Sequence, residues 1–356
     1  MNMKKIILYL TLAALLLSAC AKDPKSGVND AAKRYLDAWM QVYHPGAPQT
    51  PLGAFILEET PGTGAAAGSS DTNPFVRVNF TVRNLDGSVA GTSDAELSKQ
   101  LGTYDEASYY GPVIWSRASN GLAAGIEESV AAMRVGGRRT VVIPSWLLGV
   151  DASTGNTLVY DTAQEYMDNV SGGSPRIYEM ELTDVIPDIL KWQIDSVGRY
   201  VSRNFPGKSA ADSVKRGIYY FRTAQPTSTA DFKNDTTIYI NYIGRRLDGA
   251  VFDTSIADTA KFYGIYSASR KYGPCAVKWY GTDGTYADIT MKAAGSDSFG
   301  SVVNGFSFAL SQMHAFEKGT AVFVSNWGYG TKSSGNAIPS YSPLRFDLEV
   351  VAKPAE

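Results

Sequence analysis

Side chains that commonly carry covalent or metal chemistry are scarce in this chain of 356 residues. Its two histidines, His44 and His314, are too few for a metal cluster or a Ser-His-Asp arrangement. Two Asp-Thr pairs, at 161–162 and 253–254, could act as a two-carboxylate catalytic site only if the fold brought both carboxylates close enough to share a proton. They fall at non-equivalent points of an internal repeat, so we interpret their likeness as accidental. The chemistry of this chain is therefore expected from other residue types.

Four strings near the C-terminus combine aromatic residues with glycines and carboxylates. They are Tyr242-Ile-Gly-Arg-Arg-Leu-Asp-Gly-Ala-Val-Phe-Asp253, Val302-Val-Asn-Gly-Phe306, Asn326-Trp-Gly-Tyr-Gly330 and Ile338-Pro-Ser-Tyr-Ser-Pro-Leu-Arg-Phe-Asp347. In this order they resemble the FKBP-type peptidyl-prolyl isomerases, roughly over residues 217 to 351. The resemblance implies an α+β fold in which an antiparallel curved sheet wraps around a short helix, with an apolar proline pocket between them. A fainter copy in the first half predicts two tandem FKBP-like domains.

The reaction that the resemblance implies is rotation about the bond that precedes a proline. The planar amide opposes this rotation with a barrier of about 18 to 20 kcal/mol. A twisted amide loses its resonance and is less polar, so a dry aromatic pocket favours it over the planar form. The resemblance therefore implies proline-containing polypeptides as partners and no cofactor or metal.

The same resemblance assigns the pocket to residues of the second half. Phe306 would form its floor in place of the tryptophan common in the family, and Asp253 would help to orient it. The Val303 amide and the Tyr329 hydroxyl would hold substrate carbonyls. The full set is Tyr242, Phe252, Asp253, Val302, Val303, Phe306, Tyr329, Ile338 and Phe346. The long connection over residues 254–301 could leave this cleft open, cover it or reshape it.

The first half departs from the pattern at its corresponding positions. Phe80 replaces the tyrosine, Ala90 and Gly91 replace the Phe-Asp pair, Ile126 stands at the floor and Leu148 replaces the loop tyrosine. Alanine and glycine remove an aromatic wall and a carboxylate together. We interpret this half as a degenerate domain with a structural or peptide-binding role.

An internal repeat organises the chain. Residues 76–87 resemble residues 238–249 at an offset of about 162, and each string ends in Leu-Asp-Gly, which is typical of a hairpin turn. The offset becomes about 180 beyond residue 121, so the second copy carries roughly 18 extra residues between Tyr280 and Gly300. A period this long predicts duplicated domains rather than a solenoid. In each copy we expect a short helix, at 126–133 and 306–313, and a final strand, at 176–185 and 344–351.

Apolar residues at helical spacing predict a helix before each copy, over residues 29–43 and 190–201. Each helix is expected to pack on its own domain, with dimerisation as the alternative. The predicted organisation is a signal peptide at 1–19, a tether at 20–28, a degenerate FKBP-like domain with its N-terminal helix at 29–187, a linker helix at 188–216 and an FKBP-like isomerase domain at 217–356.

The N-terminus has the form of a secretory signal. Lys4 and Lys5 precede an apolar run over residues 6–17, which is shorter than the roughly 20 residues needed to cross a bilayer. Leu17-Ser-Ala-Cys20 resembles the bacterial lipobox, which implies diacylation of the Cys20 thiol and stable anchoring by two or more acyl chains. We expect a cell-envelope protein, anchored in the outer membrane and facing the periplasm or the surface. The alternative is an ordinary cleaved signal.

Composition limits the other partners and the means of stabilisation. The formal charge of −2, without a sustained basic run, argues against nucleic acid as a partner. Lipidation of Cys20 leaves Cys275 unpaired, so hydrophobic cores rather than disulfides must hold the body together. Cys275 itself is expected to be a small buried residue. The oligomeric state does not follow from these patterns.

Two functions from different classes agree with these observations. The first is a lipid-anchored peptidyl-prolyl isomerase that helps exported proteins to fold, with its activity in the C-terminal domain. The second is a non-catalytic surface protein of the same fold that binds peptides, proteins or glycans, for which the aromatic residues over 263–286 are candidates. An open pocket around Phe306 favours the enzyme, and a pocket filled by the extra residues favours the binding protein.

Overall fold

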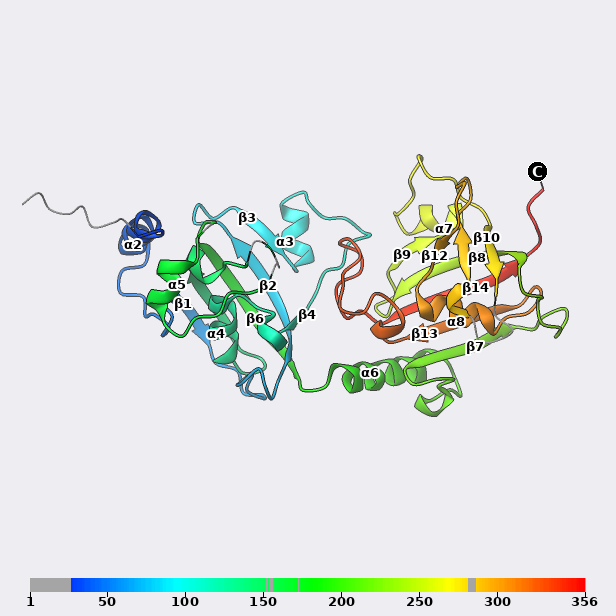
Figure 1. Ribbon diagram of the computed structural model, residues 1–356, viewed down its shortest axis with the longest axis horizontal. Helices are drawn as coiled ribbons and strands as arrows, with labels where there is room; N and C mark the ends of the chain where they lie inside the picture. Colours follow the sequence, from blue (N-terminus) through cyan, green and yellow to red (C-terminus); the bar gives the residue numbers. More distant parts are fainter. Residues whose placement is uncertain (1–26, 152, 154–155, 172, 281–285, 356) are drawn as a thin grey trace, which may run out of the picture.

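The chain forms an α+β structure with two antiparallel sheets, each built from its own half of the sequence (Figure 1). The computed structural model describes residues 27–151, 153, 156–171, 173–280 and 286–355. The predicted signal peptide, Cys20 and most of the tether lie outside these residues. Within the described residues, no helix combines the length and the hydrophobicity that crossing a membrane requires.

The first sheet has the strand order β1-β5-β6-β2-β3, and β4 also pairs with β2. We call the residues from β1 to β6 the first unit. Its strands are β1 (Phe55–Thr60), β2 (Phe75–Arg83), β3 (Val89–Thr92), β4 (Val113–Ser116), β5 (Arg138–Ile143) and β6 (Arg176–Ile186).

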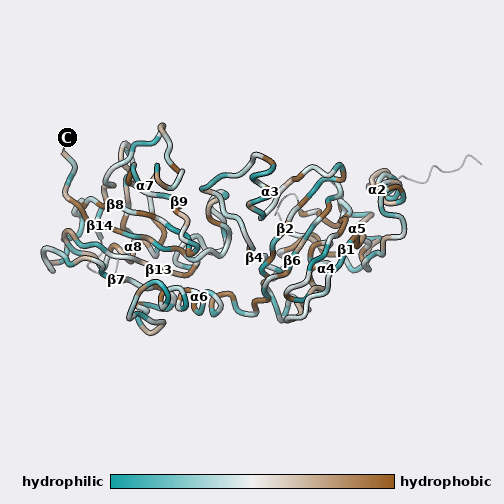
Figure 2. Tube along the Cα trace, turned by 180° about the vertical axis from the view of Figure 1, so that it is seen from behind, coloured by the Kyte–Doolittle hydropathy of each residue, from teal (hydrophilic) through white to brown (hydrophobic). Residues whose placement is uncertain are grey.

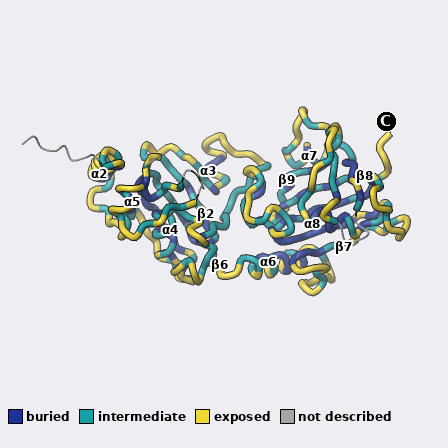
Figure 3. Tube along the Cα trace, viewed as in Figure 1, coloured by how far each residue is buried: buried dark blue, intermediate teal, exposed yellow. Residues whose placement is uncertain are grey.

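The second sheet has the order β12-β11-β10-β8-β14-β13-β7, with β9 also paired to β8. The residues from β7 to β14 are the second unit. Its strands are β7 (Ile218–Ala224), β8 (Thr236–Arg246), β9 (Val251–Thr254), β10 (Cys275–Trp279), β11 (Thr290–Lys292), β12 (Gly300–Ser301), β13 (Lys318–Phe323) and β14 (Leu344–Val351). Burial alternates along β8 and β14, because one face of each strand packs into the core (Figure 3).

The two sheets repeat one strand order. When β11 and β12 are set aside, β1, β5, β6, β2, β3 and β4 correspond to β7, β13, β14, β8, β9 and β10. The predicted hairpin turn recurs as well: the Gly87 amide donates to Asn84 at 2.9 Å, and the Gly249 amide donates to Arg246 at 3.1 Å. Both glycines have positive φ, 85° and 94°. The duplication expected from the offset is therefore present in the topology.

Helices complete the two halves, and hydrophobic residues are distributed through both (Figure 2). The α-helices are α2 (Asp30–Tyr43), α3 (Ala95–Gln100), α4 (Ala124–Ala131), α5 (Ala163–Asn169), α6 (Ile189–Asn204), α7 (Ala257–Phe262) and α8 (Asn304–Ser311). The short 3-10 helices are η1 (Ala118–Asn120), η2 (Ser145–Leu147), η3 (Ala210–Asp212), η4 (Tyr286–Asp288) and η5 (Ser325–Trp327).

Helices α4 and α8 occupy corresponding places, and both begin two residues before the predicted start. The sequence pattern places the start at the first large apolar residue, but a glycine one residue earlier is already helical in both units. A Cβ atom on Gly125 would collide with Ile143, and one on Gly305 would collide with Phe323. Glycine thus lets α4 lie close against β5 and α8 lie close against β13.

The helices that precede the units pack against them. In α2, Leu36 and Met40 are buried in the core of the first unit. Helix α6 lies on the second sheet, where it joins a separate buried cluster on the face away from α8 (Figure 1). That cluster comprises Val197, Val201, Tyr219, Phe221, Val322 and Val324. Both helices thus serve as packing elements, and dimerisation through them stays a prediction.

Candidate functional site

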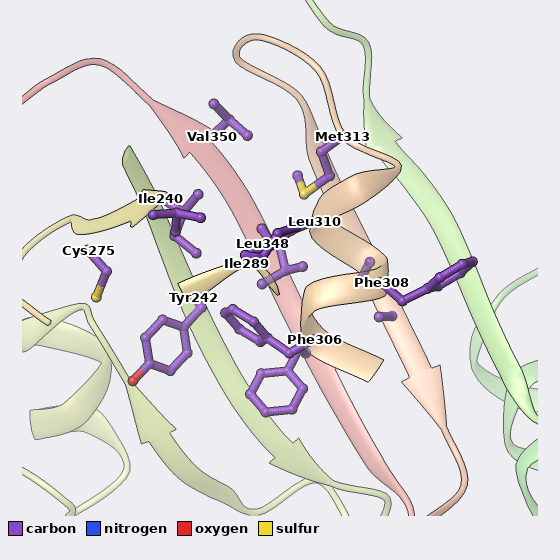
Figure 4. Close-up of a cluster of buried hydrophobic side chains, with 14 of the residues drawn as sticks. Ile240, Tyr242, Cys275, Ile289, Phe306, Phe308, Leu310, Met313, Leu348 and Val350 are labelled. Atoms are coloured by element: carbon purple, nitrogen blue, oxygen red, sulfur yellow. The ribbon is translucent and has the colours of Figure 1, made fainter. Parts of the chain in front are cut away.

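An aromatic cluster in the second unit contains four of the residues assigned to the pocket. Phe306, on α8, makes edge contacts with Tyr242 on β8 and with Phe346 on β14, with ring centroids 5.7 and 5.0 Å apart. Phe252, on β9, contacts Phe346 at 5.6 Å. Figure 4 shows Phe306 and Tyr242 facing each other between the helix and the sheet. Side chains from three strands and one helix thus form one aromatic site, and their edge-to-face contacts are an arrangement that aromatic pairs prefer.

A polar group closes one end of this cluster. The Tyr242 hydroxyl donates to Asp253 Oδ2 at 2.6 Å, and Arg270 forms an ion pair with Oδ1 of the same carboxylate. Arg270 Nη2 also donates to the Tyr242 hydroxyl oxygen at 3.2 Å. The side chains of Asp253 and Arg270 are 37% and 35% exposed, so this end of the site meets solvent.

Burial and charge act together on these groups. Burial, and then the neighbouring Asp253 carboxylate, raise the pKa of the Tyr242 hydroxyl, which stays protonated. Burial disfavours the charged form of Arg270, but its hydrogen bond and ion pair with Asp253 outweigh this and raise its pKa. The site therefore holds a neutral phenol and a fixed guanidinium, and neither group is poised to transfer a proton near neutral pH.

Local hydrogen bonds set the position of Asp253. The Tyr242 carbonyl accepts from the Thr254 hydroxyl at 2.7 Å and from the Ser255 amide at 3.1 Å. The Ser255 hydroxyl in turn accepts from the Tyr242 amide at 3.0 Å. The chain that follows Asp253 is thus anchored to the backbone of the residue whose hydroxyl the carboxylate accepts.

The remaining predicted residues surround the aromatic cluster. Val302 and Val303 are half-buried against it, and Ile338 is buried in the same core. Tyr329 is 38% exposed in the loop after η5. Neither the Val303 N–H nor the Tyr329 hydroxyl has a partner among the residues that the structure describes. Both groups are therefore free to bind a ligand carbonyl.

The extra residues of the second unit pack on the other side of α8. Tyr286, in η4, contacts the Phe308 ring at 5.3 Å and the Trp327 ring at 6.4 Å. Phe308 points away from Phe306 in Figure 4. The Lys215 ammonium lies 4.8 Å from the Phe308 centroid and 5.1 Å from that of Tyr286. This aromatic ring of the insertion thus covers the back of the helix rather than the cluster around Phe306.

The first unit has a cleft at the corresponding place. A cavity of about 740 Å³ is lined by Ala90 and Gly91 on β3, by Trp115 on β4 and by Pro339 from the second unit. Phe80 contacts Trp115 at 5.6 Å. Ile126 and Leu148 are half-buried in the first core. The absence of side-chain bulk at Ala90 and Gly91 leaves open the space that Phe252 and Asp253 occupy in the second unit.

Arg270 is the site residue that sequence reasoning missed. Its counterpart at the repeat offset is Ser108, and the counterpart of its partner Asp253 is Gly91. The guanidinium and the carboxylate are thus both present in one unit and both missing from the other. The change from Asp253 to Gly91 was visible in the sequence, but its partner Arg270 lay inside the 254–301 connection, for which no structure was predicted.

Thr162, His314 and Cys275, to which the sequence assigned no catalytic role, have structural roles. Thr162 caps α5 in a capping box with Glu165, which explains one Asp-Thr pair. His314 lies 3.0 Å from the buried Glu317 carboxylate, which also pairs with Arg222 at 3.0 Å. Cys275 is buried, and burial raises the pKa of its thiol. Among the described residues, no group of three or more potential metal ligands is found.

Comparison with known proteins gave structural neighbours but no sequence relatives. No family model and no curated protein matches the chain. A structure of the three FKBP domains of wheat FKBP73 matches at 14% identity and a TM-score of 0.26, covering 84% of this chain and 93% of that one. A peptidyl-prolyl cis-trans isomerase from Pseudomonas syringae pv. tomato DC3000 matches at 19% identity and a TM-score of 0.28, covering 46% of this chain and 93% of that one. At such low TM-scores, the chemistry of the site has to be interpreted from its own residues.

Proposed function

We propose that the second unit is an FKBP-like peptidyl-prolyl cis-trans isomerase that assists the folding of exported proteins. The observation that carries this proposal is the convergence of Tyr242, Phe252, Phe306 and Phe346 on one site whose polar end is the Tyr242, Asp253 and Arg270 group. Such a site offers apolar rings to a proline and hydrogen-bond donors to the adjacent carbonyls.

The proposed mechanism uses binding rather than proton transfer. The proline ring lies against the half-buried Phe252 and the valines at the start of α8, where little water reaches the amide. The Val303 N–H and the Tyr329 hydroxyl hold the flanking carbonyls. Because the twisted amide is less polar than the planar one, an apolar site stabilises it relative to both planar isomers. The Asp253 and Arg270 pair keeps the Tyr242 wall in place.

The decisive measurement is cis/trans exchange of a proline-containing peptide in the presence of the full chain. We expect exchange faster than in buffer and proportional to protein concentration, with a strong loss of rate in Phe252→Ala. A folded wild-type chain that leaves the exchange rate at the buffer value would overturn the isomerase proposal.

A second function remains a candidate, because the deepest part of the site is closely packed. Phe306, Ile338, Tyr242 and Phe346 are 2%, 3%, 5% and 6% exposed. A ligand that contacts only the outer residues would bind without having its amide twisted. Peptide binding at the site without any acceleration of exchange would identify a non-catalytic binding protein.

We further propose that the chain is anchored to a membrane of the cell envelope through acylated Cys20. Cys20→Ser should then move the protein from the membrane fraction to the soluble fraction, because the acyl chains provide the attachment. Circular dichroism of the released protein should match that of the wild type. Unchanged membrane partition of the variant would contradict the proposed anchor.

A further inference from the structure

The loop over residues 329–343 carries two of the proposed site residues, Tyr329 and Ile338. It lies between η5 and β14, and Figure 1 shows it reaching between the two halves of the molecule, against the chain that follows α3. Within the loop, the Ser334 amide donates to Ile338 at 2.8 Å and the Tyr341 amide donates to Gly330 at 2.9 Å. These bonds shape the loop but do not attach it to its surroundings.

The first unit supplies an attachment through its segment over residues 104–111. The Tyr109 amide donates to the Asn336 carbonyl at 2.8 Å. Nearby, the Phe75 ring on β2 makes an edge contact with Tyr341, with centroids 5.3 Å apart. Asn336 and Pro339 also form part of the wall of the first-unit cleft. The loop is therefore shared between the site of one unit and the cleft of the other.

Arg246, at the end of β8, binds both the 329–343 loop and the 104–111 segment of the first unit. Its Nη1 donates to the Ala337 carbonyl at 2.8 Å and to the Ala107 carbonyl at 3.2 Å, and its Nη2 donates to Ser108 at 3.4 Å. The guanidinium also lies over the Tyr109 ring, 5.3 Å from its centroid. Only 7% of Arg246 is exposed, so these bonds form away from bulk water, where an unmade bond is costly.

Helix α6 holds the loop at its other end. The buried Gln193 side chain donates to the Tyr341 carbonyl at 3.0 Å, and it accepts from the Ser325 amide at 2.8 Å. Gln193 thus fixes the chain on both sides of the loop. The contacts of Arg246 and the first unit then determine where the middle of the loop, including Ile338, lies.

We propose that Arg246 is a positioning residue that ties the 329–343 loop to the first unit, so that the first unit holds part of the peptide site of the second. This inference rests on the proposed function for its catalytic consequence. It gives the degenerate first unit a role: without a complete site of its own, it provides the surface that fixes a neighbouring site. The corresponding residue in the first unit is Asn84, whose side chain donates locally to Ser88.

The test compares Arg246→Ala with Arg245→Ala in the full chain. Arg245 is the adjacent residue of the same type, and it binds Asp347 and Tyr263 within the second unit. Amide hydrogen exchange is measured in peptides that cover 329–343 and 104–111, and the kinetics of a proline-containing peptide are measured in parallel. Far-UV circular dichroism and thermal unfolding establish that each variant is folded.

We expect Arg246→Ala to speed exchange about tenfold in both segments, since several bonds that hold them together are lost. It should raise KM about tenfold and change kcat less, because the loop binds the substrate rather than twisting it. Arg245→Ala should leave both segments and KM at the wild-type values. Tyr109→Ala, which changes the first unit alone, should act in the same direction as Arg246→Ala and more weakly.

The inference and the proposed function fail in different ways. Unchanged exchange over 329–343 in Arg246→Ala overturns the inference, and so does an equal effect of Arg245→Ala. Faster exchange with unchanged KM and peptide affinity also overturns it. If the wild-type chain shows no turnover, the isomerase proposal falls, and the exchange rates together with peptide affinity still decide the role of Arg246. If Arg246→Ala does not fold, Tyr109→Ala decides it.

Discussion

The loops that follow α3 and α7 share a stacked pair of tyrosines but bind different parts of the molecule. In the first, Tyr104 stacks on Tyr110 at 5.0 Å, and in the second Tyr266 stacks on Tyr272 at 5.2 Å. In both, the hydroxyl of the second tyrosine accepts from a backbone amide at 3.0 Å, that of Asp105 or Ser267. The shared frame thus positions whatever side chain stands between the tyrosines.

The residue in that position differs between the two loops. In the second loop Arg270 turns toward its own unit and binds Asp253. In the first loop Ser108 has no such partner on β3, where Gly91 stands, and its carbonyl accepts from Arg246 of the other unit. One loop therefore completes a site, and its counterpart forms an interface. The two loops thus keep the same arrangement of tyrosines, and a few other side chains determine what each loop binds.

The largest effect is expected when the second unit is given the side chains of the first. Phe252→Ala with Asp253→Gly removes a ring wall and leaves Arg270 without its carboxylate. We expect kcat/KM for a proline-containing peptide to fall about twenty- to fiftyfold, since a loss of about tenfold at Phe252 and a loss of about two- to fivefold at Asp253 multiply. The reverse change, Ala90→Phe with Gly91→Asp, should leave the rate of the full chain unchanged. The first unit would still have Ile126, Leu148 and Ser108 where the second unit has the floor ring, the loop tyrosine and the guanidinium. A double variant of the second unit with wild-type rates would remove the functional contrast between the units.

The buried Glu317 provides the next largest effect, on stability. This carboxylate is fully buried and binds Arg222, the Tyr220 hydroxyl and His314. Burial raises the pKa of Glu317, but its hydrogen bonds and the Arg222 charge outweigh burial and lower it. Because the pKa is lower in the folded state, the carboxylate stabilises the fold above its ordinary pKa, and this contribution is lost as the pH falls through the folded value.

We expect Glu317→Gln to lower the free energy of unfolding by about 1 to 3 kcal/mol at neutral pH. The difference between variant and wild type should shrink in acid and vanish below the folded pKa of the carboxyl. Urea unfolding across this pH range measures it. A difference that stays constant with pH would show that the charge of Glu317 does not contribute. This pH-dependent stabilisation is expected only in the second unit, because the corresponding turn of the first unit has Gly136 and Gly137.

Secondary structure and duplication were largely accessible from the sequence. The Leu-Asp-Gly turns reflect local backbone preferences, and the repeat offset links the two halves. The final strands β6 and β14 lie where they were predicted, at 176–186 and 344–351. Helix α5 was missed because Thr162 was considered only as part of an Asp-Thr pair. Its capping box with Glu165, three residues later, was the signal for a helix start.

The contacts between the units could not be predicted in the same way. Arg246 binds the carbonyls of Ala107, Ser108 and Ala337, and a backbone carbonyl is present at every residue whatever its type. No sequence pattern therefore marks the partner of such an arginine. The clustering of Tyr242, Phe252, Phe306 and Phe346 could be anticipated because the types of these side chains carry the resemblance. Arg270 was placed only by the structure, and a role of the cluster as a proline pocket stays a prediction.

A smaller effect is expected from the carboxylate of the site. Asp253→Ala alone should lower kcat/KM only about two- to fivefold, because rotation about the amide involves no proton transfer and the half-exposed Arg270 can be solvated. The wild-type rate should also be independent of pH across the neutral range. A loss as large as that of the double variant, or a bell-shaped pH profile, would indicate that Asp253 takes part in acid–base chemistry. The contrast between the units would then lie mainly in this carboxylate.

The smallest effect concerns the insertion that only the second unit carries. The exposed Lys215 ammonium lies over Phe308, Tyr286 and Trp327, at 4.8, 5.1 and 6.0 Å from their centroids. Lys215→Met keeps an apolar stem and loses the charge, so the free energy of unfolding should fall by only about 0.5 to 1 kcal/mol, the range of an exposed cation–π contact. Because Tyr286 covers the side of α8 opposite Phe306, isomerisation kinetics should not change. Parallel thermal unfolding and kinetics of this variant test both statements. A severalfold change in KM would mean that the back of α8 is coupled to the site, and the insertion would then count among the features that separate the two units in function.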